Sequence, residues 1–532
     1  METNRTEDGF TDRLFGRLDR AVISAGACCV GVLLLLVVCR GESTERLAGN
    51  GFLMIFVIAL AAAGGLGYVF ISRRERKNRK NAVLWLLGFY LALFALQIVW
   101  VNHVYFYTGW DAGMLRYRVE AVVNGGSMAQ CSADVGYSIY PNNLLLFYVF
   151  YLMEKVGMLF SMARPYQMCI WFSCLCVNIS CFLGNLIMRR LTQSGFVRGC
   201  YLAVSTFYVL FSPWIMIPYS DTYGMFFVML GMWAMICLDR RYLKEVTVAF
   251  AGIIGYYVKP TCIFPLFVFC LVYGLRYLAS LKSRWKELCA LALSAAVFWC
   301  VGLLIPLWIQ HTYSFRLIPE MRIPFTHYLM MGINESTKGG YNHDDFLYSY
   351  GFPDVETRKK ANLEEFRYRF ETLWREKRLG KFLEEKALVN FNDGTFAWGG
   401  EGGFFSEYVE HDNILADWFR DIAVPEGVWE NSGKYYLLYR TVLQTVWLFV
   451  LTGILFAGGR HGRQRRDMAC LVTAVCGLAA FVMLFEARAR YLFLYSPVFL
   501  VLSLCGYERI WRWAARWAGR KNNSCKPAEV VL

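Results

Sequence analysis

Residues 21–39 read AVISAGACCVGVLLLLVVC, a run without one charged side chain. A helix needs roughly 20 apolar residues to cross the hydrocarbon core of a bilayer, so this run is long enough to span it. The run lacks the small-residue cleavage pattern of a secretory signal, and a second apolar run follows at 51–71, which predicts a permanent helix. Similar runs recur along the chain and indicate a polytopic membrane protein.

The composition is typical of that class. Hydrophobic residues make up 57% of the 532 residues, aromatic residues 17% and charged residues only 18%. A soluble chain of this length carries more charge and interrupts its apolar runs more often. We therefore predict an all-α polytopic membrane protein with about 12 transmembrane helices. The predicted spans are 21–39, 51–71, 82–101, 167–188, 199–216, 222–238, 246–258, 261–277, 288–309, 438–458, 468–485 and 491–507.

The net charge of +14 comes with a clear distribution along the chain. Lys and Arg gather in short loops between the predicted spans, which is typical of cytoplasmic loops, so we expect no nucleic-acid partner. Alternation of the spans places all of these loops and both termini in the cytoplasm. The basic clusters fall at 73–80, 189–198, 240–244, 282–286, 460–466 and 509–521.

Segment 142–160 decides this topology. It is apolar enough to span the membrane, but counting it as a span would invert every later loop and place the basic clusters outside. Its aromatic residues and its Glu154-Lys155 pair suit a helix that lies along the outer interface. We therefore expect an interfacial helix there.

The topology divides the chain into five parts. The polar segment 310–435 is expected to form an extracytoplasmic domain of mixed secondary structure. The division is 1–81 for the cytoplasmic N-terminus and two extra transmembrane helices, 82–309 for a transmembrane core with a first outer loop at 102–166, 310–435 for the outer domain, 438–507 for the C-terminal helices and 508–532 for a basic cytoplasmic tail.

Two acids are expected at the outer membrane boundary. Asp111 follows the third span in Trp110-Asp111-Ala112-Gly113, and Asp221 lies in the short turn Pro218-Tyr219-Ser220-Asp221-Thr222. A partly desolvated carboxylate has a raised basicity and suits proton transfer or cation binding. Asp221 also suits a helix N-cap, and Asp111 could simply face water.

Basic residues are expected at the same face. Lys259, in Lys259-Pro260-Thr261, lies between two apolar runs, where a cation either binds an anion or extends to the interface. Arg488 and Arg490 share the junction of the last two spans and could bind a phosphate; capping of the adjacent helices is the alternative.

The outer domain contains weaker candidates. His343, Asp344 and Asp345 could bind a metal, although an exposed polar turn without a third spaced ligand explains them better. Trp398 could stack on a sugar ring, or its loop could pack against the membrane surface. The cofactor stays unknown: a divalent metal is conceivable, but the sequence requires none.

The order of these motifs resembles the GT-C superfamily of membrane glycosyltransferases, which use lipid-phosphate-linked sugar donors. The pattern is similar to protein O-mannosyltransferases, lipid A aminoarabinose transferases and bacterial relatives acting on cell-envelope glycopolymers. The resemblance covers residues 82–507 and rests on Asp111, Tyr140-Pro141-Asn142-Asn143, Met188-Arg189-Arg190, Ser212-Pro213-Trp214, Pro218-Tyr219-Ser220-Asp221, Lys259-Pro260-Thr261 and Arg488-Ala489-Arg490-Tyr491-Leu492.

The resemblance implies roles for these residues. Asp111 would activate the acceptor hydroxyl and Asp221 would be a second acid near the reacting centre, while Lys259 with one or both of Arg488 and Arg490 would neutralise the donor phosphate. It also implies inversion at the anomeric carbon. The further candidates for contacts with the acceptor or the sugar are Tyr140, Asn142, Tyr219, His327 and Trp398.

Two departures from the family pattern matter for the acceptor. Asp111 is followed by Ala112, so the Asp-Glu pair typical of protein O-mannosyltransferases is missing, and two spans precede the usual first one. A glycan or glycopolymer acceptor is therefore better supported than a protein.

We expect an enzyme that moves a sugar from a polyprenyl-phosphate-linked donor to an extracytoplasmic acceptor. A transporter or flippase for a lipid-linked glycan is a different class; it predicts a charged path through the spans, and the spans contain few charges. A GT-C-like polysaccharide ligase or polymerase shares the topology and differs only in its product.

Overall fold

The computed structural model describes residues 2–41, 46–72, 82–127, 133–313, 316–400, 409, 411–459 and 462–524. Over these ranges the chain is helical and contains no β-strand. The basic loop at 73–80, which anchors the predicted orientation, lies outside the described residues.

Nine helical segments within the described ranges are long and apolar enough to cross a membrane. The fold is therefore that of an all-α polytopic membrane protein, as predicted. These segments are α1 (Glu2–Arg40), α2 (Asn50–Ser72), α3 (Ala82–Val104), α7 (Gln167–Leu191), α9 (Ser220–Cys237), the stretch Pro260–Ala279 containing α11 (Phe264–Phe269) and α12 (Leu275–Ala279), α13 (Leu281–Thr312), α19 (Tyr436–Leu455) and α20 (Gly462–Leu484).

The remaining three predicted spans correspond to shorter or interrupted helices, so the count of 12 stays a prediction. They are α8 (Gly195–Ser205) with the π-helical turn Thr206–Leu210, α10 (Leu243–Val258), and α21 (Arg490–Phe493) followed by α22 (Ser496–Ser524). Pro260 explains the end of α10, because proline disfavours a helical conformation of the residue before it. Lys259 is accordingly extended, with φ −154° and ψ 129°.

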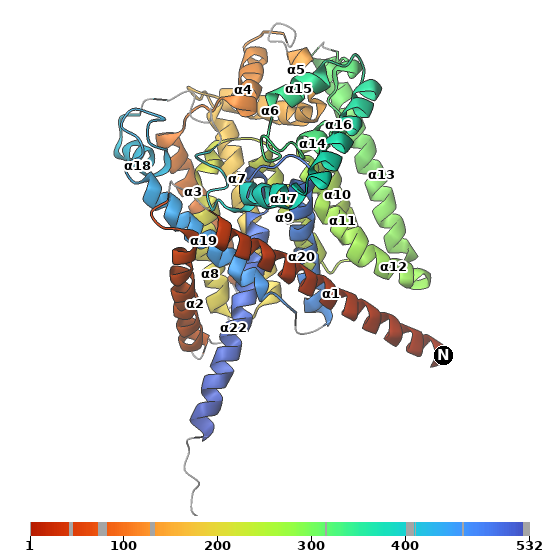
Figure 1. Ribbon diagram of the computed structural model, residues 1–532, viewed down its shortest axis with the longest axis vertical. Helices are drawn as coiled ribbons and strands as arrows, with labels where there is room; N and C mark the ends of the chain where they lie inside the picture. Colours follow the sequence, from red (N-terminus) through yellow and green to blue (C-terminus); the bar gives the residue numbers. More distant parts are fainter. Residues whose placement is uncertain are drawn as a thin grey trace, which may run out of the picture.

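Several helices gather at one end of the bundle, while the N-terminus and the far end of α22 lie toward the other end (Figure 1). We call the crowded end the domain face. Its helices are α4 (Trp110–Val123), α5 (Ala133–Ile139), α6 (Leu144–Leu159), α14 (Phe325–Met331), α15 (His343–Tyr350), α16 (Val355–Arg375), α17 (Leu379–Phe391) and α18 (Ile414–Ala423).

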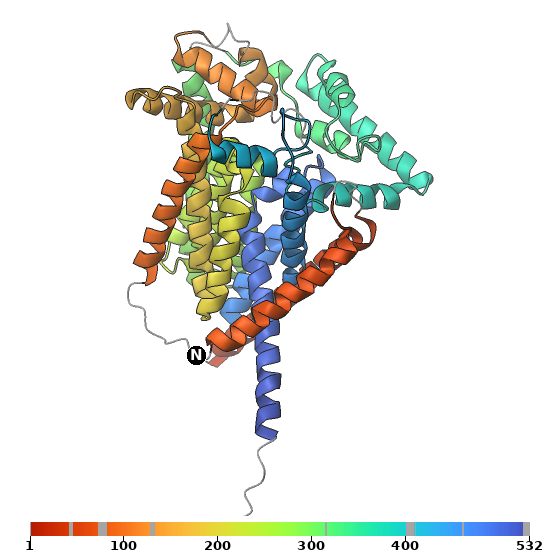
Figure 2. The same ribbon diagram turned by 90° about the vertical axis from the view of Figure 1, so that its left-hand side faces the viewer.

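Helix α6 corresponds to the segment expected at the interface. It lies across the domain face beside α4 and α5, transverse to the long helices of the bundle (Figures 1 and 2). Leu146, Phe147 and Phe150 are buried, whereas Leu159 at its end is exposed. One face of α6 therefore covers the bundle end, and the helix does not run through the bundle.

The expectation of mixed secondary structure for 310–435 is wrong, because its described residues form helices and loops only. A buried guanidinium links these helices: Arg358 donates to the carbonyls of Ser349 (2.7 Å), Arg322 (2.7 Å) and Phe352 (2.8 Å). Asp354 caps α16 by accepting hydrogen bonds from the backbone N–H groups that follow it. Local capping and these side chain–backbone bonds replace a sheet ladder.

Side-chain amides attach the two N-terminal helices to the domain face. The Asn50 amide donates to Asn392 Oδ1 (2.8 Å), and Gln444 donates to Asn50 Oδ1 (3.0 Å). At the opposite end, Asp239 pairs with both Arg190 (3.0 Å) and Arg463. Basic residues that end α7 and begin α20 are thus brought together, as the alternating topology requires.

Candidate functional site

A buried ion-pair centre lies under the domain face. Asp221, in the first turn of α9, accepts a hydrogen bond from Lys259 Nζ (2.5 Å) on one carboxylate oxygen, and its other oxygen lies 3.3 Å from Arg490 Nε in a second ion pair. The exposed fraction is 2% for Asp221, 7% for Lys259 and 3% for Arg490. Three segments that are distant in sequence therefore meet at one carboxylate.

Lys259 and Arg490 each also contact an aromatic ring. The Arg490 guanidinium lies over the Trp110 ring at 4.1 Å from its centroid, and the Lys259 ammonium lies over the Tyr491 ring at 4.0 Å. Such cation–π contacts gain strength when the cation is desolvated. Tyr219 packs edge-on against Trp110 with centroids 5.1 Å apart, so the start of α4 is joined to the start of α9.

The turn between α20 and α21 adds a second ion pair. Arg488 Nε lies 3.1 Å from Glu486 Oε1, and the Tyr491 hydroxyl donates to Glu486 Oε2 at 3.0 Å. The side chain of Arg488 is 23% exposed, more than either buried cation. Arg488 is thus the cation of this group that extends furthest toward solvent.

Helix α17 holds this turn in place. Asn390 accepts a hydrogen bond from the Arg488 N–H (2.9 Å) and donates to the Val482 carbonyl (3.2 Å). The fully buried Lys386 ammonium donates to the carbonyls of Phe485 (2.7 Å) and Gly332. The position of the turn therefore depends on an element of the domain face.

Asp111 is placed by a tight turn at the start of α4. Trp110 has a φ of 39°, a left-handed value that costs a bulky residue conformational energy. Gly113 permits the turn, because a Cβ there would lie 2.2 Å from the Thr108 carbonyl oxygen. The Asp111 side chain is exposed and forms no hydrogen bond or ion pair with any residue that the structure describes.

Four tyrosines lie within electrostatic range of Asp111. Burial raises the pKa of Tyr140, Tyr219, Tyr328 and Tyr341, and the negative charge of Asp111 contributes to each increase. The charge of Glu486 acts on Tyr140, Tyr328 and Tyr341 in the same direction. Asp111 and Glu486 are therefore close enough to share these neighbours.

We call this group the site cluster. It collects charged and phenolic side chains from both halves of the chain at the domain face. Its members are Asp111, Tyr140, Tyr219, Asp221, Lys259, Tyr328, Tyr341, Glu486, Arg488 and Arg490.

Seven of the residues singled out in the sequence lie in the site cluster: Asp111, Asp221, Lys259, Arg488, Arg490, Tyr140 and Tyr219. Asn142 lies close in sequence to Tyr140, but it is exposed and its amide bonds the neighbouring Asn143 (3.2 Å). Among the described residues, its side chain forms no hydrogen bond with a member of the cluster.

The structure contradicts the predicted sugar contacts of His327 and Trp398, because both side chains are buried. Burial lowers the pKa of His327 to about 4, and its Nδ1 bonds Ser349 Oγ (2.8 Å) inside the domain. Trp398 is 1% exposed, packs against Trp214 and donates to the Ala423 carbonyl (2.7 Å). Neither ring has a free face for a sugar. The aromatic residues Phe404 and Phe405, which neighbour Trp398 in sequence, lie outside the described residues.

Three members of the site cluster, Glu486, Tyr328 and Tyr341, were given no role from the sequence. Glu486 lies two residues before Arg488, and an acid beside arginines in a short turn was the available signal. Tyr328 and Tyr341 lie in a polar segment without a recognisable pattern. Only the folded domain brings them within electrostatic range of Asp111.

The Asp345 carboxylate, considered above as a metal ligand, is buried and accepts hydrogen bonds from Arg369 (2.7 Å) and Asn334 (2.8 Å). Among the described residues, no three His, Cys, Asp or Glu side chains are grouped so that they could hold a metal ion.

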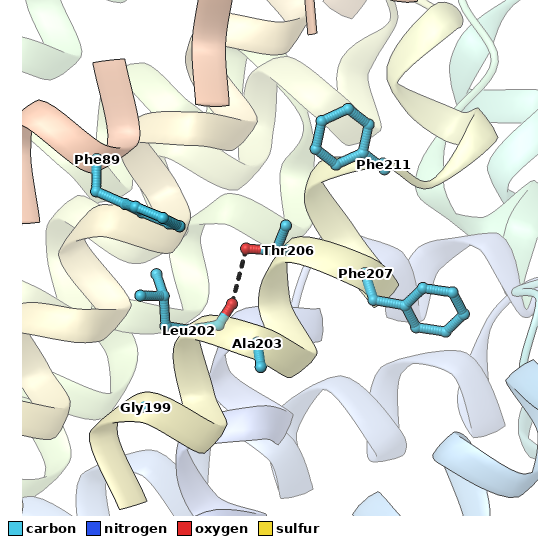
Figure 3. Close-up of a pocket in the computed structure, with 7 residues that line it drawn as sticks. All are labelled: Phe89, Gly199, Leu202, Ala203, Thr206, Phe207 and Phe211. Carbon is cyan, nitrogen blue, oxygen red and sulfur yellow. Dashed lines mark hydrogen bonds between the residues drawn. The ribbon is translucent and has the colours of Figure 1, made fainter. Parts of the chain in front are cut away.

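An apolar groove of about 480 Å³ lies between α3 and α8, away from the site cluster (Figure 3). Its lining carries no charged group, and the Thr206 hydroxyl is used internally by donation to the Leu202 carbonyl (2.8 Å). The groove therefore offers apolar contact and no groups for acid–base chemistry.

The fold and the apolar spans define an integral membrane protein. The chain belongs to the family described as "conserved hypothetical integral membrane protein", whose model matches residues 40–511. No curated protein and no solved structure matches the chain.

Proposed function

We propose that the protein is a GT-C-like membrane glycosyltransferase. It moves a sugar from a polyprenyl-phosphate-linked donor to an extracytoplasmic acceptor, a cell-envelope glycan or glycopolymer. The observation that carries this proposal is the convergence of Asp111, Lys259, Arg488 and Arg490 at one face of the bundle.

The cations suit a lipid phosphate. Arg488 is partly exposed and contacts the phosphate oxygens, while Lys259 and Arg490 supply positive potential from below. Fixed cations in a site of low dielectric stabilise the negative charge that develops as the phosphate leaves. The prenyl chain of such a donor stays in the bilayer, which borders the bundle.

Asp111 suits the acceptor side. Its exposed carboxylate accepts the proton of an acceptor hydroxyl as that oxygen bonds to the anomeric carbon. The bond between the anomeric carbon and the phosphate oxygen breaks, and its electron pair leaves with the polyprenyl phosphate. The proton passes from Asp111 to water afterwards. The tyrosine hydroxyls around Asp111 provide hydrogen bonds for the sugar hydroxyls.

Asp221 is assigned a positioning role in place of direct chemistry. It is 2% exposed, and both of its oxygens lie beside cations. A carboxylate in this setting orients Lys259 and Arg490, and its negative charge offsets the energetic cost of burying these two cations.

The test is sugar transfer by purified protein in nanodiscs, with polyprenyl-phosphate-linked sugars and envelope glycans as substrates. We expect Asp111→Asn to lower kcat about 100-fold or more, in the range of lost general-base catalysis, with the thermal midpoint unchanged. Asp344→Asn, an exposed acid of α15, is the matched control and should keep full activity.

Wild-type activity in Asp111→Asn would remove Asp111 from the mechanism. Movement of a lipid-linked sugar across vesicles by the wild type, without transfer to any acceptor, would replace the enzyme with a transporter. Product length distinguishes transfer of one sugar from ligation or polymerisation.

A further inference from the structure

Helix α16 carries an apolar stripe that no described element covers. Leu363, Phe370 and Trp374 are 39%, 39% and 67% exposed, and their spacing places them on one side of the helix. The Phe370 and Trp374 rings lie 6.3 Å apart, and Phe370 lies at the same distance from Phe366, which is partly buried against Ile333, Leu373 and Phe382. Exposed apolar rows of this kind mark a contact surface.

The stripe ends where α16 turns back into α17, and this hairpin lies beside the ends of the first span. Arg40, the last residue of α1, pairs with Glu384 of α17 (3.4 Å). The apolar run of α1 ends at Cys39, so α17 lies at the depth where hydrocarbon gives way to headgroups. Figure 2 shows the hairpin projecting sideways from the bundle.

The hairpin tip is rich in basic residues. Lys377 adopts a left-handed conformation (φ 56°) that closes the turn. Basic side chains beside Trp and Phe are typical of segments at a membrane interface, because the rings enter the headgroup boundary while the charges reach phosphate groups. The basic residues of the tip are Arg375, Lys377, Arg378 and Lys381. Arg375, Arg378 and Lys381 pair with glutamates, whereas Lys377 has no ion-pair partner among the described residues.

We propose that the α16–α17 hairpin inserts its Phe370–Trp374 end into the interface of the leaflet on the domain face. The bilayer is the occupant that the depth of the hairpin favours, because α17 lies beside the end of the first span. A glycan or a second copy of the chain would also meet aromatic rings, but neither explains why the stripe ends beside the end of a span.

This contact also connects the lipid surface to the site cluster. Helix α17 begins at the hairpin and carries Lys386 and Asn390, which hold the turn containing Glu486 and Arg488. The inference does not depend on sugar transfer, since it concerns only where the hairpin lies.

The test is photocrosslinking with p-benzoylphenylalanine in nanodiscs of phosphatidylglycerol and phosphatidylethanolamine. Trp374 and Tyr368 are each 67% exposed, and Tyr368 lies about 120° away around the same helix, which makes it a matched control. We expect phospholipid adducts at position 374 in several-fold excess over position 368, read by mass spectrometry of the labelled peptide.

Position 370 serves as the second probe if the 374 variant does not fold. Equal phospholipid yields at 374 and 368 would overturn the proposal. So would adducts at 374 or 370 that join the hairpin to a second copy of the chain or to an added envelope glycan in place of lipid.

Discussion

At the scale of single residues, the two acids singled out in the sequence differ most in burial. Asp221 is enclosed with Lys259 and Arg490, whereas Asp111 is exposed with no ionic partner among the described residues. Their sequence contexts are alike, since each stands near an aromatic residue at the edge of an apolar run. Burial depends on what other segments cover, so the sequence could not separate the two roles.

This difference predicts that Asp221→Asn lowers the stability of the protein and that Asp111→Asn leaves it unchanged. Asp221→Asn leaves Lys259 and Arg490 buried without their anion, which costs about 3–5 kcal/mol for a broken buried pair. Its thermal midpoint in nanodiscs should fall well below that of the wild type, while that of Asp111→Asn should not. A stable but inactive Asp221→Asn would instead place Asp221 in the chemistry.

At the scale of elements, α17 unexpectedly connects the outer domain to the turn between α20 and α21. It lies in the outer domain by sequence, yet Lys386 and Asn390 bond the turn that carries Glu486 and Arg488. Nothing in LGKFLEEKALVNF marks this function, because a helix with scattered Lys and Asn residues usually exposes them. The bonds exist only because α17 packs against the end of α20.

Lys386 gives α17 a measurable pH dependence. Burial lowers the pKa of its amine from 10.5 to about 7, with the charge of Glu486 acting in the opposite direction. Between these two pKa values the unfolded chain binds a proton that the folded chain lacks, so this group makes stability rise with pH across the window. Below the lower pKa the cost of the buried charge is fully present.

Lys386→Met should therefore flatten the increase of the thermal midpoint between pH 7 and pH 10 relative to the wild type. It also leaves two buried carbonyls without their donor, at about 1–3 kcal/mol each, so the variant should be less stable throughout. Lys360→Met, an exposed site on α16, is the control and should follow the wild-type curve. Parallel curves for Lys386→Met and the wild type would contradict the assignment.

At the scale of the whole molecule, the fold brings the predicted site residues to one face because α6 does not pass through the bundle (Figures 1 and 2). Had it done so, the start of α4 and the start of α9 would lie at opposite ends. The contact between Trp110 and Tyr219 shows that they meet. Which face is extracytoplasmic stays a prediction that rests on the basic loops.

We predict that the domain face is extracytoplasmic. A membrane-impermeant thiol reagent should label Lys360→Cys in intact cells. It should label Ser283→Cys, in the first turn of α13 at the opposite end, only after the membrane is opened. Wild-type protein corrects for its native cysteines. Labelling of Ser283→Cys in intact cells would invert the orientation and move the site cluster to the cytoplasm.

The sequence by itself determined the fold class, because uninterrupted apolar runs of spanning length have no other stable setting than a bilayer. It also located seven members of the site cluster, since charged residues at the edges of such runs are costly and therefore conspicuous. Tertiary structure alone decided that Asp221 is a buried counter-ion, that Tyr328 and Tyr341 join Asp111, and that Trp398 and His327 pack inside. Those outcomes depend on contacts between segments that are tens to hundreds of residues apart, which local composition and periodicity do not encode.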